Sequence, residues 1–183
     1  MRTFSPNPFK SVIDIDVLGS YNTVKAALLY LIARASKNRP QNEAGSVGIG
    51  GRINCVSTMM HYIGTPRQSH SCTAKAAVDA VAHAVCIEQG PLGVTSSVIS
   101  PEPIADSEGI SRVFSKCKQT LTGKTPSGRQ STVRGVADAT IYLFSEAESY
   151  INREILVVDG GRWHTNCQPT GRVVIPGRYT LTL

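Results

Sequence analysis

The sequence has no long apolar run and no ordered cysteine pattern. Its apolar stretches fall short of the roughly 18 consecutive residues that a membrane-spanning helix needs, and its start, MRTFSPNPFK, lacks the apolar core of a secretory signal. The five cysteines show neither CxxC nor another metal-ligand spacing, so we interpret them as free thiols of a reducing compartment. These absences predict a chain without membrane, metal or disulfide chemistry.

The chain also lacks a concentrated basic segment, although its formal net charge is +6. Its lysines and arginines are dispersed, and no stripe of aromatic and basic residues marks a nucleic-acid-binding face. We therefore expect no nucleic-acid partner. Two interpretations of the charge stay open: a solvated surface, or attraction of a polyanionic small molecule such as a nucleotide or coenzyme A. With 41% hydrophobic and 17% charged residues, the 183 residues have the balance of one globular domain.

Four segments have the apolar spacing or the composition of helices. Residues 9–37 combine apolar positions at helical spacing with the strong helix formers of VKAALLYLIARA, which predicts one long helix. Residues 72–89 repeat an apolar face and are followed by Gly90 and Pro91, a pair that ends helices. Shorter helices are expected over 105–118 and 132–145.

Three short β-rich runs alternate with these helices: 52–57, 94–100 and 154–158. The alternation predicts an α/β fold, a doubly wound parallel sheet with helices on both faces. Because ligands bind beyond the carboxyl ends of such strands, Thr58, Pro101 and Gly160 should border one edge. The loop 38–51 contains the glycine run GSVGIGG, but this run follows a helix and opens a strand. A dinucleotide-binding loop does the reverse, so we reject it as a phosphate-binding loop.

The most informative segment runs from Thr58 to Lys75. Thr58 lies at a strand end, and Lys75 lies near the start of an apolar helix, four residues after Ser71. The motifs HYIGTPRQSH, AKAAVDA, GPLG, SEG and VVDGG complete the pattern. From about residue 9 to residue 163 the chain resembles the C-terminal part of the short-chain dehydrogenase/reductase family. Within that family it is similar to the fungal peroxisomal 2,4-dienoyl-CoA reductases, with serine in place of the tyrosine of YxxxK.

This resemblance implies NADPH-dependent reduction of a 2,4-dienoyl-CoA during the breakdown of unsaturated fatty acids. It implies a catalytic pair of Asp16 and Lys75, because these reductases work without the tyrosine acid. Lys75 would stabilise negative charge developing on the thioester and hold the nicotinamide ribose. Asp16 would orient a water that delivers the proton. Thr58 offers a hydroxyl where many relatives carry serine, and Ser71 is limited to hydrogen bonding because its hydroxyl is far less acidic than a tyrosine's.

The resemblance also assigns the cofactor contacts to Lys75, Pro101, Ile104 and Ser107. One position departs from the family pattern. Glu102 stands where a glycine is expected, and that glycine lets the backbone approach the nicotinamide. We expect the bulk and the negative charge of Glu102 to oppose cofactor binding.

The first half of the family pattern has no counterpart in the sequence, which lacks the TGxxxGxG turn and the NNAG-like strand. We therefore expect a partial Rossmann-like sheet without the N-terminal nucleotide-binding half. It would form a truncated domain over 1–165, followed by a divergent tail over 166–183. Such a chain alone is expected to have weak or no reductase activity. The tail ends in LTL and not in an SKL-type address, so the location is peroxisomal by resemblance and otherwise cytoplasmic.

Two other functional interpretations stay open. The chain could be a cofactor-free pseudoenzyme or an oligomer-forming subunit, because 9–37 and 72–89 match the helices that relatives use to form dimers and tetramers. It could also be a repurposed, NADPH-independent isomerase or cyclase of a biosynthetic pathway. The expected partners are an acyl-CoA or another small-molecule substrate and, through the two long helices, further copies of the chain.

Overall fold

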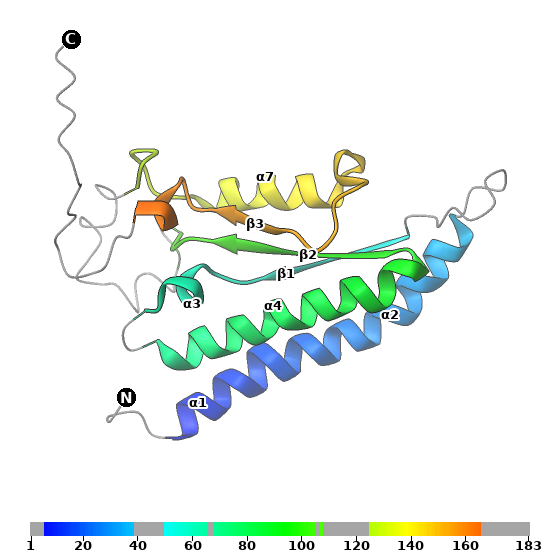
Figure 1. Cartoon of the computed structure of the whole chain (residues 1–183), viewed down its shortest axis with the longest axis horizontal. Helices are drawn as coiled ribbons and strands as arrows, with labels where there is room; N and C mark the ends of the chain where they lie inside the picture. Colours follow the sequence, from blue (N-terminus) through cyan, green and yellow to red (C-terminus); the bar gives the residue numbers. More distant parts are fainter. Residues whose placement is uncertain (1–5, 39–49, 66–67, 105–106, 108–124, 166–183) are drawn as a thin grey trace, which may run out of the picture.

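The computed structural model describes residues 6–38, 50–65, 68–104, 107 and 125–165. Within these residues it has a parallel sheet of three strands in the order β1-β2-β3, with bounds Gly51–Val56, Val94–Pro101 and Ile155–Val158. The α-helices are α1 (Pro6–Val12), α2 (Gly19–Lys37), α3 (Met60–Ile63), α4 (Ser69–Gln89) and α7 (Val133–Phe144). Helices α1, α2 and α4 lie on one face of the sheet and α7 lies on the other (Figure 1).

The predicted α/β fold with a parallel sheet is confirmed. The helices expected over 9–37, 72–89 and 132–145 are present with shifted ends, and so are the three strands. The short helix α3 was missed, because four residues are too few to show a period. Three expected segments fall wholly or largely outside the described residues: the helix over 105–118, the loop 38–51 and the tail 166–183.

The sequence predicted one regular helix over 9–37. The structure instead changes to a π-helix over Ile13–Leu18. Such wide turns are rare and are frequently found at functional sites. Two apolar residues of this segment, Ile15 and Leu18, are 72% and 50% exposed. The π-helical segment itself packs against α4.

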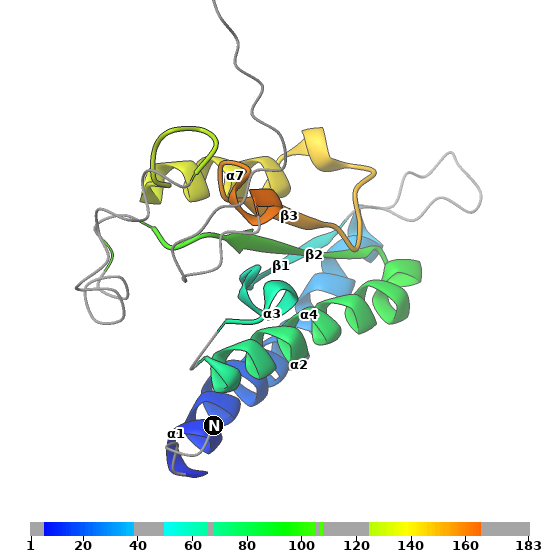
Figure 2. The ribbon, with the colours of Figure 1, turned by 60° about the vertical axis from the view of Figure 1, so that its left-hand side comes forward.

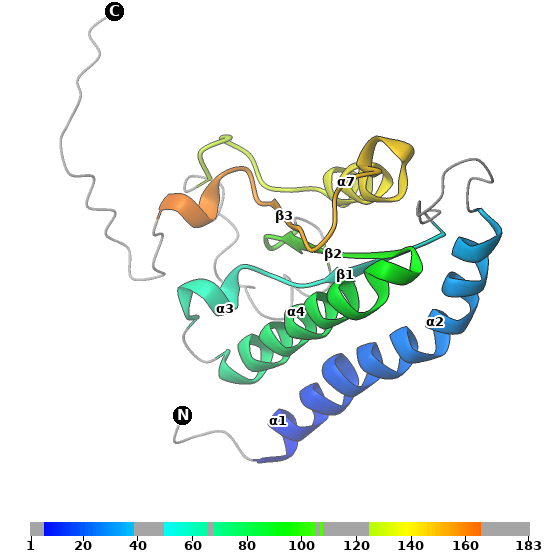
Figure 3. The same ribbon diagram turned by 45° about the vertical axis from the view of Figure 1, so that its right-hand side comes forward.

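The core lies between α4 and the first two strands. Val78 and Ala82 of α4 pack with Cys55 of β1 and Val98 of β2. Ala74 and Ala82 are fully buried, and their small side chains let the helix approach the sheet closely. Figures 2 and 3 show α4 lying along the sheet, with α1 and α2 beside it.

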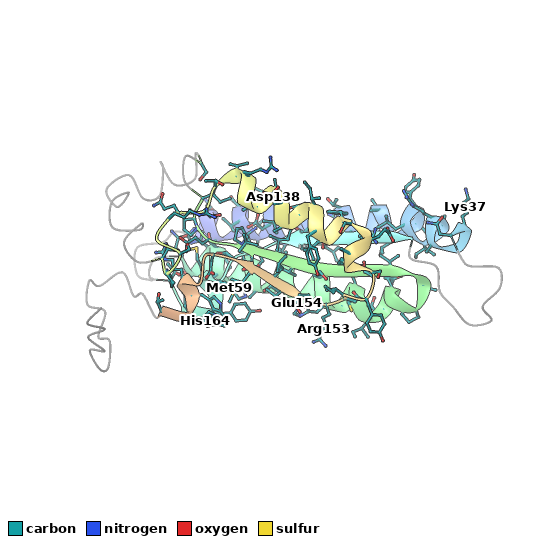
Figure 4. The ribbon with its side chains drawn as sticks, turned by 90° about the horizontal axis from the view of Figure 1, so that it is seen from above. Lys37, Met59, Asp138, Arg153, Glu154 and His164 are labelled. Carbon is teal, nitrogen blue, oxygen red and sulfur yellow. The ribbon has the colours of Figure 1, made fainter. Side chains whose placement is uncertain are left out.

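The opposite face of the sheet is covered in part by α7. Its first turn is capped by Thr132, whose side chain accepts a hydrogen bond from the backbone N–H of Gly135, and its Leu143 is 1% exposed. Figure 4 views the molecule from this side. Met59 and His164 lie at one end of the layered structure, and Lys37 lies at the other (Figure 4).

Three properties bear on the function classes considered above. No helix among the described residues is long and apolar enough to cross a membrane. The part of the chain that the structure covers contains no group of three or more metal-ligating side chains suited to an ion. Cys55, Cys72 and Cys86 are free thiols.

The glycine pair before the first strand has a packing role. A Cβ at Gly50 would lie 1.9 Å from the Ala35 Cα, and a Cβ at Gly51 would lie 2.5 Å from the Leu31 Cβ. The backbone entering β1 therefore touches α2 directly, and only glycine leaves room for this approach. The glycines that end GSVGIGG thus seat β1 on the helix.

We predict that Gly50→Ala lowers the free energy of unfolding by about 2 kcal/mol or more, because the added methyl collides with helix backbone. The matched control is Gly19→Ala within the long helix. There the new Cβ would meet nothing closer than the Asp14 carbonyl oxygen at 3.9 Å, so we expect a gain of about 0.5–1 kcal/mol. Urea unfolding measures both. Equal effects of the two substitutions would contradict the close approach.

Candidate active site

Asp16 and Lys75 meet at the end of the sheet where the strands terminate. Asp16 lies in the π-helical segment and Lys75 in the first turns of α4, and the Lys75 Nζ is 3.4 Å from the Asp16 Oδ2. Their side chains are 26% and 30% exposed, so the pair is accessible to a ligand. A partly exposed ion pair contributes only about 0–1 kcal/mol to stability. Its accessibility matters more here than its contribution to folding.

Lys75 is also anchored to the end of the first strand. Its Nζ donates to the Val56 carbonyl oxygen at 3.2 Å. The next residue, Ser57, donates its backbone N–H to Ile99 of β2. Since alternate residues of a strand direct their backbone groups to opposite sides, the Val56 carbonyl faces away from β2. No described strand pairs with this edge of β1. Lys75 thus gives the Val56 carbonyl on that edge a hydrogen-bond donor.

The segment that follows β1 is tied to the same lysine. Ser57 is 4% exposed, and its Oγ donates to the Lys75 carbonyl oxygen at 3.5 Å. Thr58 is half-buried, and its Oγ1 accepts a hydrogen bond from the Met60 backbone N–H at 3.4 Å, just where α3 begins. The Thr58 hydroxyl is therefore used locally, within a segment that is bound to Lys75.

Ser71 and Lys75 lie one helical turn apart on α4, so they share one face of that helix. Ser71 is half-buried. The structure therefore places both residues beside the N-terminal end of α4, and it brings Asp16 to Lys75 from a separate helix. The chemical role of each residue stays a prediction.

The residues assigned to the cofactor follow the second strand. Pro101 ends β2 and pairs with Val158 of β3. Beyond it, Ile104 and Ser107 are half-buried, and the Ser107 backbone N–H donates to the Ile104 carbonyl oxygen at 3.3 Å. Ile104 and Ser107 thus follow the carboxyl end of β2, the end of the sheet at which the sequence analysis expected a ligand. The contacts of these residues with a cofactor stay a prediction.

Glu102 is held in the interior by a partner that the sequence did not reveal. Its carboxylate accepts from the Arg162 Nη1 at 2.9 Å, and its side chain is only 4% exposed. Burial raises the pKa of Glu102, the Arg162 guanidinium lowers it, and the nearby Asp159 carboxylate raises it further. The negative charge of Glu102 is thus paired with Arg162, and its expected effect on cofactor binding stays a prediction.

Arg162 is positioned by the turn that follows β3. Asp159 is buried there, and its carboxylate accepts from the backbone N–H groups of Gly161 at 2.8 Å and Trp163 at 2.7 Å. These bonds form the short 3-10 turn Arg162–Thr165. The VVDGG motif therefore ends a strand and presents the arginine that binds Glu102.

Comparisons with known proteins show the family to which the chain belongs. A family model described as Enoyl-(Acyl carrier protein) reductase matches residues 1–162. A peroxisomal 2,4-dienoyl-CoA reductase of Saccharomyces cerevisiae is 44% identical to the chain over 161 residues, which is 87% of this chain and 50% of that protein. The chain belongs to the short-chain dehydrogenase/reductase family. The family resemblance expected from the sequence is thereby confirmed.

Two further relatives are also peroxisomal 2,4-dienoyl-CoA reductases. A peroxisomal 2,4-dienoyl-CoA reductase of Arabidopsis thaliana is 34% identical over 161 residues, covering 87% of this chain and 52% of that protein. The one from Danio rerio is 32% identical over 174 residues, covering 94% and 53%. The chain thus spans about half the length of the relatives that it matches.

Solved structures of the family share the fold. A gluconate 5-dehydrogenase from Burkholderia cenocepacia, in complex with NADP and tartrate, matches with a TM-score of 0.75 at 20% identity. The match covers 89% of this chain and 59% of the Burkholderia cenocepacia chain. A protein from Beutenbergia cavernae, described as an NAD(P)-dependent gluconate 5-dehydrogenase with bound NADP, matches with a TM-score of 0.76 at 19% identity, over 89% and 60%. At these identities the likeness establishes the fold alone.

The buried Glu102 predicts a pH dependence of stability. A carboxyl whose pKa is raised in the folded state binds its proton more tightly there than in the unfolded chain. Stability is therefore lost as the pH rises from the unfolded value of 4.5 through the folded pKa. We predict that Glu102→Gln, which can still accept from Arg162, removes this loss.

The measurement is urea unfolding of both proteins between pH 4 and pH 7, about the range in which carboxylates titrate. The difference in unfolding free energy, wild type minus Glu102→Gln, should fall as the pH rises. Glu148, whose pKa burial also raises, is unchanged in both proteins and cancels. A difference that rises with pH would contradict the assigned shift.

Proposed function

We propose that the chain carries the catalytic part of an oxidoreductase of the 2,4-dienoyl-CoA reductase type, which uses NADPH. The observation that carries the proposal is the meeting of Asp16 and Lys75 at 3.4 Å beyond the ends of the strands. The 44% identity to a yeast peroxisomal 2,4-dienoyl-CoA reductase supports it. The peroxisomal descriptions of the relatives support the same location for this protein.

Lys75 is suited to stabilise negative charge on a substrate. Reduction of a conjugated thioester builds negative charge on the thioester oxygen, and a cation at a partly desolvated site lowers the energy of that state. Two fixed oxygens, the Val56 carbonyl and the Asp16 carboxylate, hold the Lys75 ammonium. The ammonium donates one of its three hydrogens to the Val56 carbonyl, so another is available to a substrate or a cofactor hydroxyl.

Asp16 is suited to deliver a proton through water. Its side chain is 30% exposed, so the carboxylate can accept hydrogen bonds from solvent as well as contact Lys75. A carboxylate in this position orients a water toward a carbon that has gained negative charge. Ser71, one turn before Lys75 on α4, is left with a hydrogen-bonding role.

The described residues fit the nicotinamide and ribose end of NADPH. Lys75 has an exposed part of its side chain for the ribose, and the turn with Ile104 and Ser107 follows the strand end beside it. Glu102 has its charge buried against Arg162, so it does not oppose a dinucleotide electrostatically. When bound, NADPH supplies the hydride, while Lys75 and Asp16 act on the acyl chain and its proton.

We predict that the purified chain, at high concentration with saturating NADPH, slowly reduces a 2,4-dienoyl-CoA. Lys75→Met should lower kcat about a hundredfold or more by removing the cation. Asp16→Asn should lower it about a hundredfold by removing the water-orienting carboxylate. NADPH consumption is followed by absorbance, and product by mass spectrometry.

The control is Lys37→Met, which removes an exposed lysine at the opposite end of the molecule (Figure 4). It should leave kcat unchanged. A folded wild-type chain without turnover, or equal turnover by Lys75→Met, would refute the proposed activity for this chain. Conversion of the acyl-CoA without NADPH consumption would favour an isomerase instead.

We also propose that the chain associates with itself through its long helices, which is the feature that favours an oligomer-forming subunit. Large apolar side chains are exposed along these helices: Ile15 at 72%, Leu29 at 76%, Tyr30 at 79% and, on α4, Ile87 at 64%. Helices α2 and α4 pack against each other, so their outward faces are continuous. A second copy offers the same apolar faces and would cover them symmetrically.

We predict that Leu29→Lys weakens self-association at least about tenfold in Kd, which corresponds to about 1.4 kcal/mol. The matched control is Val133→Lys on α7, where a similarly exposed apolar side chain lies on the other side of the sheet. It should not change the association. Sedimentation velocity measures both. A wild-type chain that stays monomeric at every concentration would contradict the proposal.

A further inference from the structure

A second cluster of polar side chains lies behind Lys75, and neither the resemblance nor the proposed chemistry assigns it a role. The Asp79 cluster consists of His61 and Tyr62 of α3 and Asp79 of α4. The His61 Nε2 lies 2.9 Å from the Asp79 Oδ2, and the Tyr62 hydroxyl donates to the same oxygen at 3.2 Å. The side chains of His61 and Asp79 are only 9% and 5% exposed.

Stability alone does not account for a buried carboxylate at this place. Removing a carboxylate from water costs several kcal/mol, roughly, and replacing a whole buried polar pair with apolar side chains of similar volume is often neutral or stabilising. The Asp79 Oδ1 and the His61 Nδ1 have no hydrogen-bond partner among the described residues, which adds to the cost. A buried carboxylate with this cost in stability is a candidate for fixing the positions of the residues that it contacts.

The cluster connects the two elements that carry the candidate site. Asp79 lies one helical turn after Lys75 on α4, and α3 begins two residues after Thr58. Helix α3 has only four residues and no side-chain N-cap. A helix this short is not stable by itself. Its orientation therefore depends on contacts such as those of His61 and Tyr62 with Asp79.

The charge of Asp79 also reaches titratable neighbours on α3 and on β1. It contributes, after burial, to the raised pKa of Tyr62 on α3 and of Cys55 on β1, whereas Lys75 on α4 lowers the pKa of Cys55. Asp79 and Lys75 thus shift the pKa of the Cys55 thiol in opposite directions. The carboxylate is close enough to the site for its loss to be felt there.

We infer that Asp79 is a positioning residue for the reaction: by binding His61 and Tyr62 it fixes α3 against α4 and so aligns Thr58 with Lys75. This inference rests on the proposed reductase function. It concerns placement only, because Asp79 is buried and does not touch the reacting atoms. The shared oxygen Oδ2, which both α3 side chains contact, is the group that performs this role.

The test compares Asp79→Leu, Asp79→Asn and the control Asp138→Asn in the full chain. Leucine fills the volume without a hydrogen bond, whereas the asparagine oxygen can still accept from His61 and Tyr62. Asp138 pairs with Arg134 on the exposed side of α7. For Asp79→Leu we expect a folded but less stable chain, because His61 loses its buried partner, with an unchanged KM and kcat lowered about tenfold to a hundredfold by misplacement. Asp79→Asn should recover most of kcat, and Asp138→Asn should have no effect.

A second readout is independent of any activity. Hydrogen exchange of the backbone amides over 57–63 should become at least about tenfold faster in Asp79→Leu, while exchange in the strands is unchanged. Normal exchange over 57–63, or a kcat equal to that of the wild type, would overturn the inference. If the wild-type chain has no turnover, the proposed function fails. The exchange result then still decides whether Asp79 fixes α3.

Discussion

The candidate site depends on how closely α4 packs against the first two strands. Ala74 and Ala82 are fully buried at this contact, where larger side chains would hold the helix away from the sheet. Because the contact fixes both the distance and the rotation of α4, it places Lys75 within reach of the Val56 carbonyl at the end of β1. The apolar packing of the core thereby determines the position of the one cation proposed to act on a substrate.

Three separate segments complete the site around this lysine. The π-helical segment brings Asp16 to it, the turn after β1 is bound to its carbonyl through Ser57, and the loop after β2 follows from the neighbouring strand end. The edge of β1 that faces away from β2 is unpaired within the described residues. The chain spans about half the length of its relatives. The reductase activity proposed for it therefore rests on the half that contains Asp16 and Lys75.

Local sequence patterns predicted most of the fold, because the helices and strands of a parallel sheet have clear periods and glycine or proline boundaries. The pairing of Asp16 with Lys75 followed from the resemblance, and no local pattern could show that a π-helix would present the carboxylate. The bond between Glu102 and Arg162 joins residues far apart in the chain, so it needed the structure. The same holds for Gly50, which looks like part of a flexible loop and instead seats a strand against Ala35. His61 and Tyr62 belong to the motif HYIGTPRQSH, but a four-residue helix shows no period, so the sequence did not place them against Asp79.

The most direct test of the central claim is a single-turnover reaction of the folded chain with a 2,4-dienoyl-CoA and NADPH that carries deuterium at the transferred position. Mass spectrometry of the acyl product measures where the deuterium goes. If Asp16 and Lys75 form a working reductase site, one deuterium appears in the acyl chain of the reduced product. Deuterium that remains entirely on the nucleotide, in a chain shown to be folded, would contradict the account.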